Sequence, residues 1–335
     1  MSVPFSPTVP QTQSPNSSTV RVESDASLPQ LLGALAAVGK VFLGKPEVVR
    51  LAWVCLLAEG HLLLEDVPGT GKTLLARALA RCLGGDFHRI QFTPDLLPSD
   101  LLGTSVLMQN TGAFEFQAGP IFAHVILADE INRASPRTQS ALLEAMSEMK
   151  VSLDGKTHLL GPPFFVLATQ NPHEFEGTYP LPESQLDRFM MRLTIGYPDR
   201  AAERAILEGH RQGDPIDGLQ AHLNPHSVVA LQKQARQIQF DAALADYLLA
   251  IVEATRHHAD LRVGASTRAA LGFYRAAQAN ALLAGRGYVI PDDIKSLAQP
   301  VLSHRLLVRH GQGRDHGQMA HEVVRQIVEK TAVPV

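Results

Sequence analysis

Apolar residues occur along this chain in two patterns, a helical spacing and short continuous runs, which predict helices and buried strands. Apolar positions three and four residues apart, the spacing of an amphipathic helix, run from Leu28 to Val41 and from Val48 to Leu57. Five shorter apolar runs follow, each of a length that suits a strand buried in a parallel sheet. They are His61–Leu64, Arg89–Phe92, His124–Ala128, Phe164–Thr169 and Arg192–Ile195. Strands that alternate with helices predict an α/β core with a five-stranded parallel sheet.

The pattern changes after Tyr197 and Pro198, where strand-like runs stop and amphipathic helices take over. Examples are Val228–Ile238, Leu244–Ala254 and Ala269–Leu283. We therefore expect residues 28–197 to form the α/β domain and residues 198–335 to form an all-helical second domain. Residues 1–27 are rich in Pro, Ser, Thr and Gln and lack a repeating apolar pattern, so they are expected to form a disordered N-terminal arm.

A phosphate-binding loop connects the first predicted strand to the next helix. Glycines let backbone N–H groups turn toward phosphate oxygens, a lysine balances the phosphate charge, and a hydroxyl can coordinate Mg²⁺. A helix that begins at this point adds the positive end of its dipole. The residues expected to bind the nucleotide are Pro68, Gly69, Thr70, Gly71, Lys72, Thr73 and Leu74. The chain is therefore expected to bind ATP together with Mg²⁺.

One position departs from the generic GxxxxGK[ST] pattern, because Asp66 stands where that pattern has its first glycine. The two glycines nearest the phosphates, Gly69 and Gly71, are present. The sequence alone suggests no physical role for the Asp66 carboxylate. A glycine-rich turn without a ligand is the alternative interpretation of the loop taken by itself.

Two carboxylates end the apolar run Val125–Ala128 and point to the chemistry of the site. In open α/β sheets, ligands bind at the carboxyl ends of the strands, and Asp129 and Glu130 stand at such an end. Asp129 is expected to hold Mg²⁺ together with Thr73, while Glu130 orients and deprotonates the water that attacks the γ-phosphate. Acids that merely cap a strand are the alternative, but the phosphate loop upstream favours the catalytic interpretation.

A third strand end carries a polar amide. Asn171 follows the run Phe165–Thr169, where its side chain could hydrogen-bond the γ-phosphate or the attacking water. A residue of this type before Pro172 is also common in turns, and taken alone the turn is the simpler interpretation.

Four segments together resemble a MoxR-type AAA+ ATPase. The resemblance covers nearly everything after the N-terminal arm. Its most specific part is the segment Glu176–Phe189, because other AAA+ branches share the phosphate loop and the acids but not this sequence. The segments are Glu65–Thr73, Asp129–Arg133, Ala168–Pro172 and Glu176–Phe189. This resemblance implies a P-loop AAA+ core with five parallel strands, followed by an all-helical lid domain.

The same resemblance implies roles for three polar residues beyond the loop and the acids. Asn171 would be sensor 1, Arg188 the arginine finger delivered to a neighbouring subunit, and Arg268 sensor 2 on a lid helix. A salt bridge to a nearby carboxylate is the alternative role for Arg188, and an exposed surface position is the alternative for Arg268. Two further arginines are rival candidates for the finger, namely Arg133 and Arg137.

Two β-hairpins are predicted within the core. Asp154-Gly155, flanked by the alternating residues Val151–Leu159, is a strong signal for a two-residue turn. A second hairpin is expected around Asn110–Gly112, inserted in the helix after the second strand. Both insertions resemble the AAA+ branch that contains magnesium chelatase, where such hairpins face a pore or a client. Plain edge hairpins on a globular domain are the alternative.

Composition limits the classes of protein that this chain could belong to. The chain has 335 residues, of which 45% are hydrophobic and 19% charged, as expected for a globular protein. Its formal net charge of -3 provides no overall basic field for nucleic acid, and no apolar run is long enough to span a membrane. A cytoplasmic protein is expected. The two cysteines, Cys55 and Cys82, lie in apolar helical patterns and are expected to be buried. The basic segment 304–310 is predicted to be a solvated helix face with its C-terminal turn.

A MoxR-type protein implies an ATP-driven remodeller of other proteins. By this resemblance the chain would form a homo-oligomer, a hexameric ring, and would act with a partner that carries a von Willebrand factor A domain on a protein client, in protein maturation or metal-cofactor insertion. The alternatives are a nucleic-acid-stimulated motor and a nucleotide-switched scaffold with little turnover. Neither hairpin shows the interleaved arginines and aromatics of a nucleic-acid groove, so nucleic acid is the less favoured partner.

Overall fold

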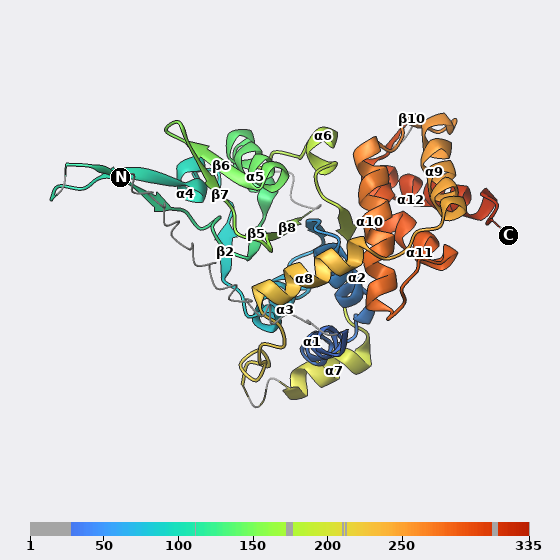
Figure 1. Ribbon diagram of the computed structural model, residues 1–335, viewed down its shortest axis with the longest axis horizontal. Coiled ribbons are helices and arrows are strands. Elements are labelled where there is room, and N and C mark those ends of the chain that lie inside the picture. Colours follow the sequence, from blue (N-terminus) through green and yellow to red (C-terminus); the bar gives the residue numbers. More distant parts are fainter. Residues whose placement is uncertain are drawn as a thin grey trace, which may run out of the picture.

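The computed structural model describes residues 28–110, 112–171, 177–209, 211, 213–309 and 314–334. The predicted arm and four residues named in the sequence predictions lie outside the described residues, namely Thr111, Pro172, Glu176 and His310. Two parts are evident in Figure 1: a sheet-containing part with two projecting hairpins, and a group of helices beside it. No helix among the described residues is both long and apolar enough to cross a bilayer.

A five-stranded sheet forms the centre of the first part, in the order β2-β5-β8-β1-β9. Every pairing within it is parallel, which confirms the predicted sheet. The strands are β1 (Leu62–Glu65), β2 (Phe87–Gln91), β5 (Val125–Asp129), β8 (Phe165–Gln170) and β9 (Met191–Leu193). Each strand begins or ends within two residues of the predicted run, so the apolar runs identified all five strands.

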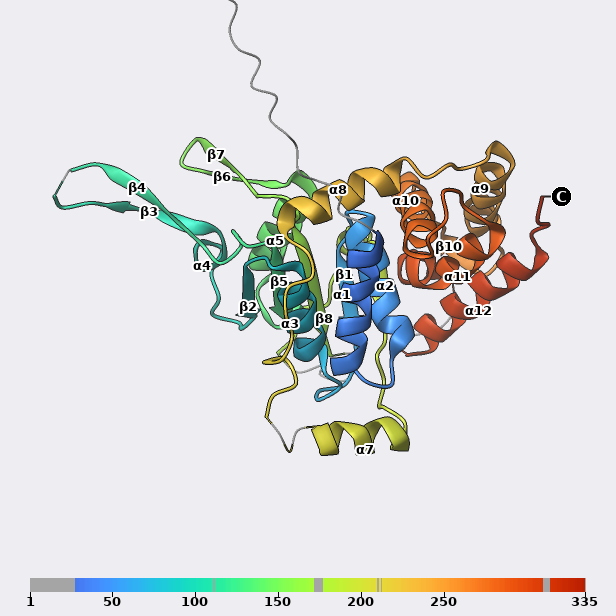
Figure 2. The same cartoon turned by 60° about the horizontal axis from the view of Figure 1, so that its bottom comes forward.

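Helices cover both faces of this sheet, because successive strand residues point to opposite sides. Leu62 and Leu64 of β1 pack into a core with the helices of one face, whereas Leu63 packs into the core on the other face. The first face is covered by α1 (Leu28–Val41), α2 (Pro46–Leu57) and α3 (Lys72–Leu83). The second is covered by α4 (Pro98–Leu102) and α5 (Pro136–Glu148). The result is a three-layer arrangement (Figure 2).

Both predicted hairpins are present. The first pairs β3 (Gly103–Leu107) with β4 (Phe114–Ala118) and directly follows α4, and the second pairs β6 (Lys150–Leu153) with β7 (Lys156–Leu159). At the second turn Asp154 has a φ of 51° and Gly155 a φ of 74°, the signature of the predicted two-residue turn. The hairpins touch each other: Phe116 stacks on His158 with 3.9 Å between ring centroids. They project together from the core (Figure 2).

Among the described residues, the chain after Tyr197 is helical apart from one short ribbon. Its helices are α7 (Arg200–Gly209), α8 (Pro225–Arg236), α9 (Ala242–His257), α10 (Thr267–Leu283), α11 (Pro291–Leu302) and α12 (Arg314–Lys330). The ribbon pairs β10 (Leu261–Val263) antiparallel with β11 (Leu307–Val308), and the apolar pattern did not predict it. Strands of two and three residues are too short to give a periodic signal.

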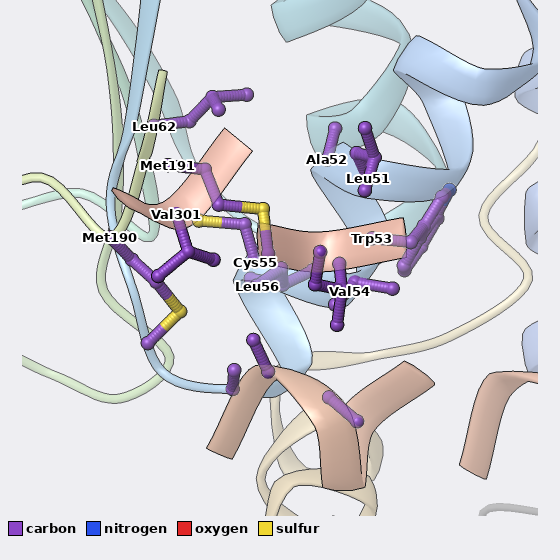
Figure 3. Close-up of a cluster of buried hydrophobic side chains, with 14 of the residues drawn as sticks. Leu51, Ala52, Trp53, Val54, Cys55, Leu56, Leu62, Met190, Met191 and Val301 are labelled. Atoms are coloured by element: carbon purple, nitrogen blue, oxygen red, sulfur yellow. The ribbon is translucent and has the colours of Figure 1, made fainter. Parts of the chain in front are cut away.

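The two parts share one hydrophobic core. Helix α2 packs between the sheet and the helical part, and Figure 3 shows its residues Trp53 and Cys55 in the same cluster as Met191 of β9 and Val301 of α11. Both cysteines are buried and free, as predicted. The predicted boundary near residue 198 therefore does not divide the molecule into two separate hydrophobic cores.

The predicted solvated helix face at residues 304–309 is wrong. His304 and Arg305 lie in a buried 3₁₀ turn, Ser303–Arg305. The Arg305 Nη2 donates to the carbonyl of Phe189 at 2.5 Å, and its Nε lies 3.5 Å from a carboxylate oxygen of Asp187. A buried cation is tolerated when such oxygens surround it, and no local sequence pattern reveals them. Burial and the adjacent Arg305 charge hold the pKa of His304 well below its usual range.

Candidate functional site

The phosphate loop has the backbone that its glycines predict. Gly69 and Gly71 have φ angles of 84° and 89°, in the left-handed region that glycine adopts without strain. A Cβ on Gly71 would come within 3.0 Å of the Phe42 ring, whereas the space beside Gly69 is open. The Lys72 ammonium donates to the carbonyls of Asp66 at 2.7 Å and Val67 at 3.1 Å. The loop thus places two glycines with left-handed backbone and a lysine directly before and at the start of α3, and these features fit a bound triphosphate.

Asp129 and Glu130 stand at the carboxyl end of β5, held by the neighbouring strand. The Thr169 hydroxyl donates to Asp129 Oδ1 at 2.6 Å and accepts from the Glu130 N–H at 2.9 Å. Glu130 has a φ of 57°, unusual for a residue with a side chain. One hydroxyl therefore fixes both acids, and the left-handed backbone at Glu130 turns its side chain away from the strand direction. Thr169 was not among the site residues predicted from the sequence.

Two side chains from β2 also hold these acids, and neither was predicted from the sequence. Arg89 donates to Asp129 Oδ2 through Nη2 at 2.7 Å and through Nε at 3.1 Å. Its Nη2 also donates to Gln91, whose Nε2 donates to Glu130 Oε2 at 2.7 Å. Glu130 is paired with Arg133 as well, at 3.1 Å. A signal for this network was available: Arg89 and Gln91 are two residues apart on one strand, so both face the same side.

The end of β8 brings Asn171 to the same edge as the phosphate loop. Glu65 and Gln170 are paired in register at the ends of β1 and β8, and Gln170 Nε2 donates to Glu65 Oε1 at 3.0 Å. The Asp66 N–H also donates to the Gln170 carbonyl at 3.2 Å. Asn171 itself is buried. Because the parallel strands end together, the loop, the two acids and Asn171 share one edge of the sheet.

Arg188, the arginine predicted as a finger, contacts helix α5 of the same chain. Arg188 Nη1 donates to the Leu143 carbonyl and to the Ser147 hydroxyl, both at 2.7 Å. Within the described residues it forms no ion pair with Asp187 or Glu183, so the salt bridge considered as its alternative role is absent. Of the rivals, Arg133 is paired with Glu130, as described above, and Arg137 is exposed. The described chain contains no hydrogen bond or ion pair of Arg137.

Arg268 lies in the first turn of α10. Its side chain is exposed and makes no hydrogen bond or ion pair with any described residue. The helix start is tied to the core, because Ser266 caps α10 and also donates to both carboxylate oxygens of Asp187 at 3.1 Å. Asp187 also lies beside the buried Arg305. The segment that carries Arg188 and the helix that carries Arg268 are therefore joined through Asp187.

Residues 177–181 contact the turn after β5. They belong to the segment Glu176–Phe189, which is the most specific part of the resemblance. The Tyr179 N–H donates to the Asn132 carbonyl at 2.6 Å. Gln139, which is buried, donates through Nε2 to the carbonyls of Ile131, Ala134 and Tyr179. These contacts hold residues 177–181 against the loop that follows Glu130, which is a structural reason for the amino-acid sequence of this segment.

Comparison with known proteins decides the family. Residues 61–191 match a family model described as "ATPase family associated with various cellular activities (AAA)", and residues 253–327 match an "AAA lid domain". The chain is 42% identical to the chaperone MoxR1 of Mycobacterium tuberculosis over 311 residues, which cover 90% of this chain and 81% of the relative. It belongs to the MoxR family of AAA ATPases.

Other relatives of this MoxR-family ATPase are similar over almost their whole length. The uncharacterized protein YeaC of Bacillus subtilis is 48% identical, covering 91% of this chain and 95% of the relative. A solved structure of a candidate ATPase from Cytophaga hutchinsonii superposes with a TM-score of 0.84 at 38% identity, covering 92% of this chain and 96% of that one. The AAA core followed by an AAA lid, expected from the sequence, is thus confirmed.

Proposed function

We propose that this MoxR-family protein hydrolyses ATP and uses the energy to remodel a protein client. It would do so as a homo-oligomeric ring, a hexamer, together with a partner that carries a von Willebrand factor A domain, in protein maturation or metal-cofactor insertion. The observation that carries the proposal is the gathering of the glycine-lined loop, the Thr169-bound acids and Asn171 at one sheet edge. ATPase relatives across the whole chain support it.

Each polar group at this edge has a task in the proposed hydrolysis. Lys72 and the backbone N–H groups of the loop bind the phosphates, and Glu130 takes the proton of the attacking water, which Asn171 helps to orient. Thr73 and Asp129 would hold Mg²⁺, which neutralises phosphate charge. The hydroxyl and the carboxylate suit this hard cation, which prefers oxygen ligands. Arg268 would sense the nucleotide from the lid.

The hairpin surfaces favour a polypeptide client over nucleic acid. Their exposed apolar side chains include Leu107, Phe114 and Leu159, with exposed fractions of 51%, 70% and 77%. Basic residues are few, and one of them, Lys150, is already paired with Glu148 at 3.4 Å. Exposed apolar patches mark surfaces for protein contact, whereas a nucleic-acid groove needs cations interleaved with aromatic rings.

Phosphate release by the purified protein tests the hydrolysis directly. Lys72→Ala should abolish nucleotide binding, and Glu130→Gln should bind ATP but lower turnover by about 100-fold, the typical worth of general base catalysis. Matched controls are Lys233→Ala on α8 and Glu208→Gln on α7, both exposed. Equal turnover in the wild type and in Glu130→Gln would show that the chain is a nucleotide-binding scaffold. Stimulation by DNA that disappears with rising salt would instead favour the motor.

Mixing inactive variants tests the arginine finger and the ring together. If Arg188 acts on a neighbour, Arg188→Ala and Glu130→Gln should each be inactive alone and regain turnover when mixed. The gain arises because an intact Arg188→Ala site then receives its arginine from a Glu130→Gln subunit. No gain would reject Arg188, and the same mixture with Arg137→Ala tests the exposed rival. Mass photometry with a slowly hydrolysed ATP analogue reports whether six subunits assemble.

A further inference from the structure

Asp66, the residue that replaces the first glycine of the phosphate-loop pattern, holds a distant segment of the chain. Its carboxylate is buried and accepts three backbone hydrogen bonds. Oδ1 accepts from the Val67 N–H at 2.8 Å, and Oδ2 accepts from the N–H groups of Ile195 at 2.7 Å and Gly196 at 2.5 Å. A glycine at this position could make none of these bonds. Hydrogen bonds to an ionised carboxylate are also shorter and stronger than those between neutral groups.

The main chain of Asp66 makes two more contacts, so this one residue joins three parts of the site. Its N–H donates to the carbonyl of Gln170, which precedes Asn171, and its carbonyl accepts from the Lys72 ammonium. Ile195 and Gly196 belong to the connection that leaves β9 and leads to α7 and the helical part. The start of the phosphate loop is therefore tied at once to the end of β8, to Lys72 and to that connection.

We propose that Asp66 is a positioning residue, which clamps the phosphate loop to the connection at Ile195 and Gly196 and so sets the place of the loop relative to Asn171. The inference rests on the proposed ATP hydrolysis for its catalytic consequence, but the clamp also acts on nucleotide binding. If the clamp is correct, substitution of Asp66 weakens nucleotide binding. If the Asp66 carboxylate were only a negative charge near the anion site, it would repel the nucleotide, and its neutralisation would tighten binding.

Two substitutions separate the clamp from the loop pattern. Asp66→Asn keeps the shape but replaces one acceptor oxygen with a donor, and Asp66→Gly restores the generic pattern while removing every side-chain bond. We expect the Kd of a fluorescent ATP analogue to rise by about tenfold and kcat to fall by about tenfold in Asp66→Asn, with larger losses in Asp66→Gly, because small misplacements of reacting groups cost this much or more. The matched control is Asp199→Asn.

The control makes the same chemical change outside the site. Asp199 Oδ1 accepts from the Ala202 N–H at 2.7 Å at the start of α7, and asparagine caps a helix about as well, so both constants should stay within about twofold of the wild type. A tighter Kd in Asp66→Asn, or values for Asp66→Gly equal to those of the wild type, would overturn the proposal. The first result would show a bystander charge, and the second would show that glycine serves as well.

A substitution on the other side of the clamp guards against loss of folding. Gly196 has a φ of 67°, so Gly196→Ala strains the connection, while the added Cβ would meet only the Lys45 ammonium at 3.5 Å. It should lower kcat in the same direction, and the double variant with Asp66→Asn should be little worse than the worse single one. Losses that multiply would reject the clamp.

The outcome for the clamp remains readable if the proposed hydrolysis fails. A wild type that binds ATP but releases no phosphate would reject the proposed function, and the Kd values of the Asp66 variants would still decide the inference. Amide exchange gives a second reading, since the N–H groups of Ile195 and Gly196 should exchange at least about tenfold faster in Asp66→Asn than in the wild type. Unchanged exchange would show that these N–H groups do not depend on the carboxylate.

Discussion

Acid should weaken the fold through one buried histidine at the start of β1. His61 is buried, its Nδ1 accepts from the Val166 N–H at 3.1 Å, and its Nε2 lies 3.2 Å from the Met146 carbonyl. These partners require a neutral ring with its proton on Nε2, because protonation of Nδ1 would set two donors against each other. Burial lowers the pKa of His61 from 6.5 to about 4, with a smaller opposing effect from the Met146 hydrogen bond.

The sign and size of the effect follow from proton linkage. Between pH 6.5 and pH 4 the unfolded chain binds a proton at His61 that the folded chain does not, so the free energy of unfolding falls as the pH falls through this window. From pH 8 to pH 5 the two pKa values give a loss of about 2 kcal/mol, and the loss levels off at about 3 kcal/mol below pH 4.

His61→Gln isolates this contribution from other titrating groups. The variant keeps a donor that can reach Met146 but leaves the Val166 N–H without its acceptor, which should cost about 1–3 kcal/mol at every pH. Its free energy of unfolding should therefore be lower at pH 8, yet should fall by about 2 kcal/mol less than that of the wild type on going to pH 5. Glutamine has no proton to gain in this range.

Urea unfolding followed by tryptophan fluorescence measures these quantities, because Trp53 is the single tryptophan of the chain and is fully buried. The exposed His226 provides the control, and His226→Gln should show the same pH dependence as the wild type. If His61→Gln loses as much stability between pH 8 and pH 5 as the wild type does, the assignment of the acid sensitivity to His61 is wrong.

Three further predictions test contacts around the proposed nucleotide site and the segment beside it. Thr169→Val should fold and bind nucleotide but lower kcat by at least about tenfold, because the shared hydroxyl that orients both acids is lost, whereas Thr169→Ser should retain most activity; phosphate release measures both. Arg89→Ala should lower the Mg²⁺ concentration for half-maximal turnover by about threefold, because it removes a cation that competes with Mg²⁺ for Asp129. A higher Mg²⁺ requirement in the variant would refute this competition. Asp187→Ala should destabilise the fold by about 3 kcal/mol in urea unfolding because it leaves the buried Arg305 without its carboxylate, and Asp187→Asn, which keeps an acceptor, should cost less.

The sequence predicted those features of the fold that depend on residues close together in the chain. The Asp154-Gly155 turn was predictable because both residues adopt positive φ readily, and the five strands were predictable because buried parallel strands read as short apolar runs. The places of the phosphate loop and of the acids in the fold were predictable because each lies at the end of such a run, whereas their roles in catalysis stay predictions. In these cases the residues that determine the structure are neighbours in the chain.

Long-range partners explain what the sequence could not show. The Asp66 carboxylate binds N–H groups 129 and 130 residues away, and backbone donors leave no trace in the amino-acid sequence. Arg305 looked like a solvated charge because its carbonyl partners lie 115 and 116 residues upstream. Both cases place a charge in the interior where the main chain satisfies it, and the hydropathy of the residue alone predicts the opposite.

The position of α2 between the sheet and the helical part limits how the molecule can move and how it can be divided. A fragment that ends at Tyr197 would leave the apolar surface around Trp53 and Cys55 bare, so we expect it to aggregate rather than to fold as an independent nucleotide-binding unit. For the same reason, swinging the helical part away from α2 would expose that surface to water, so we expect any motion between them to be a slide over α2.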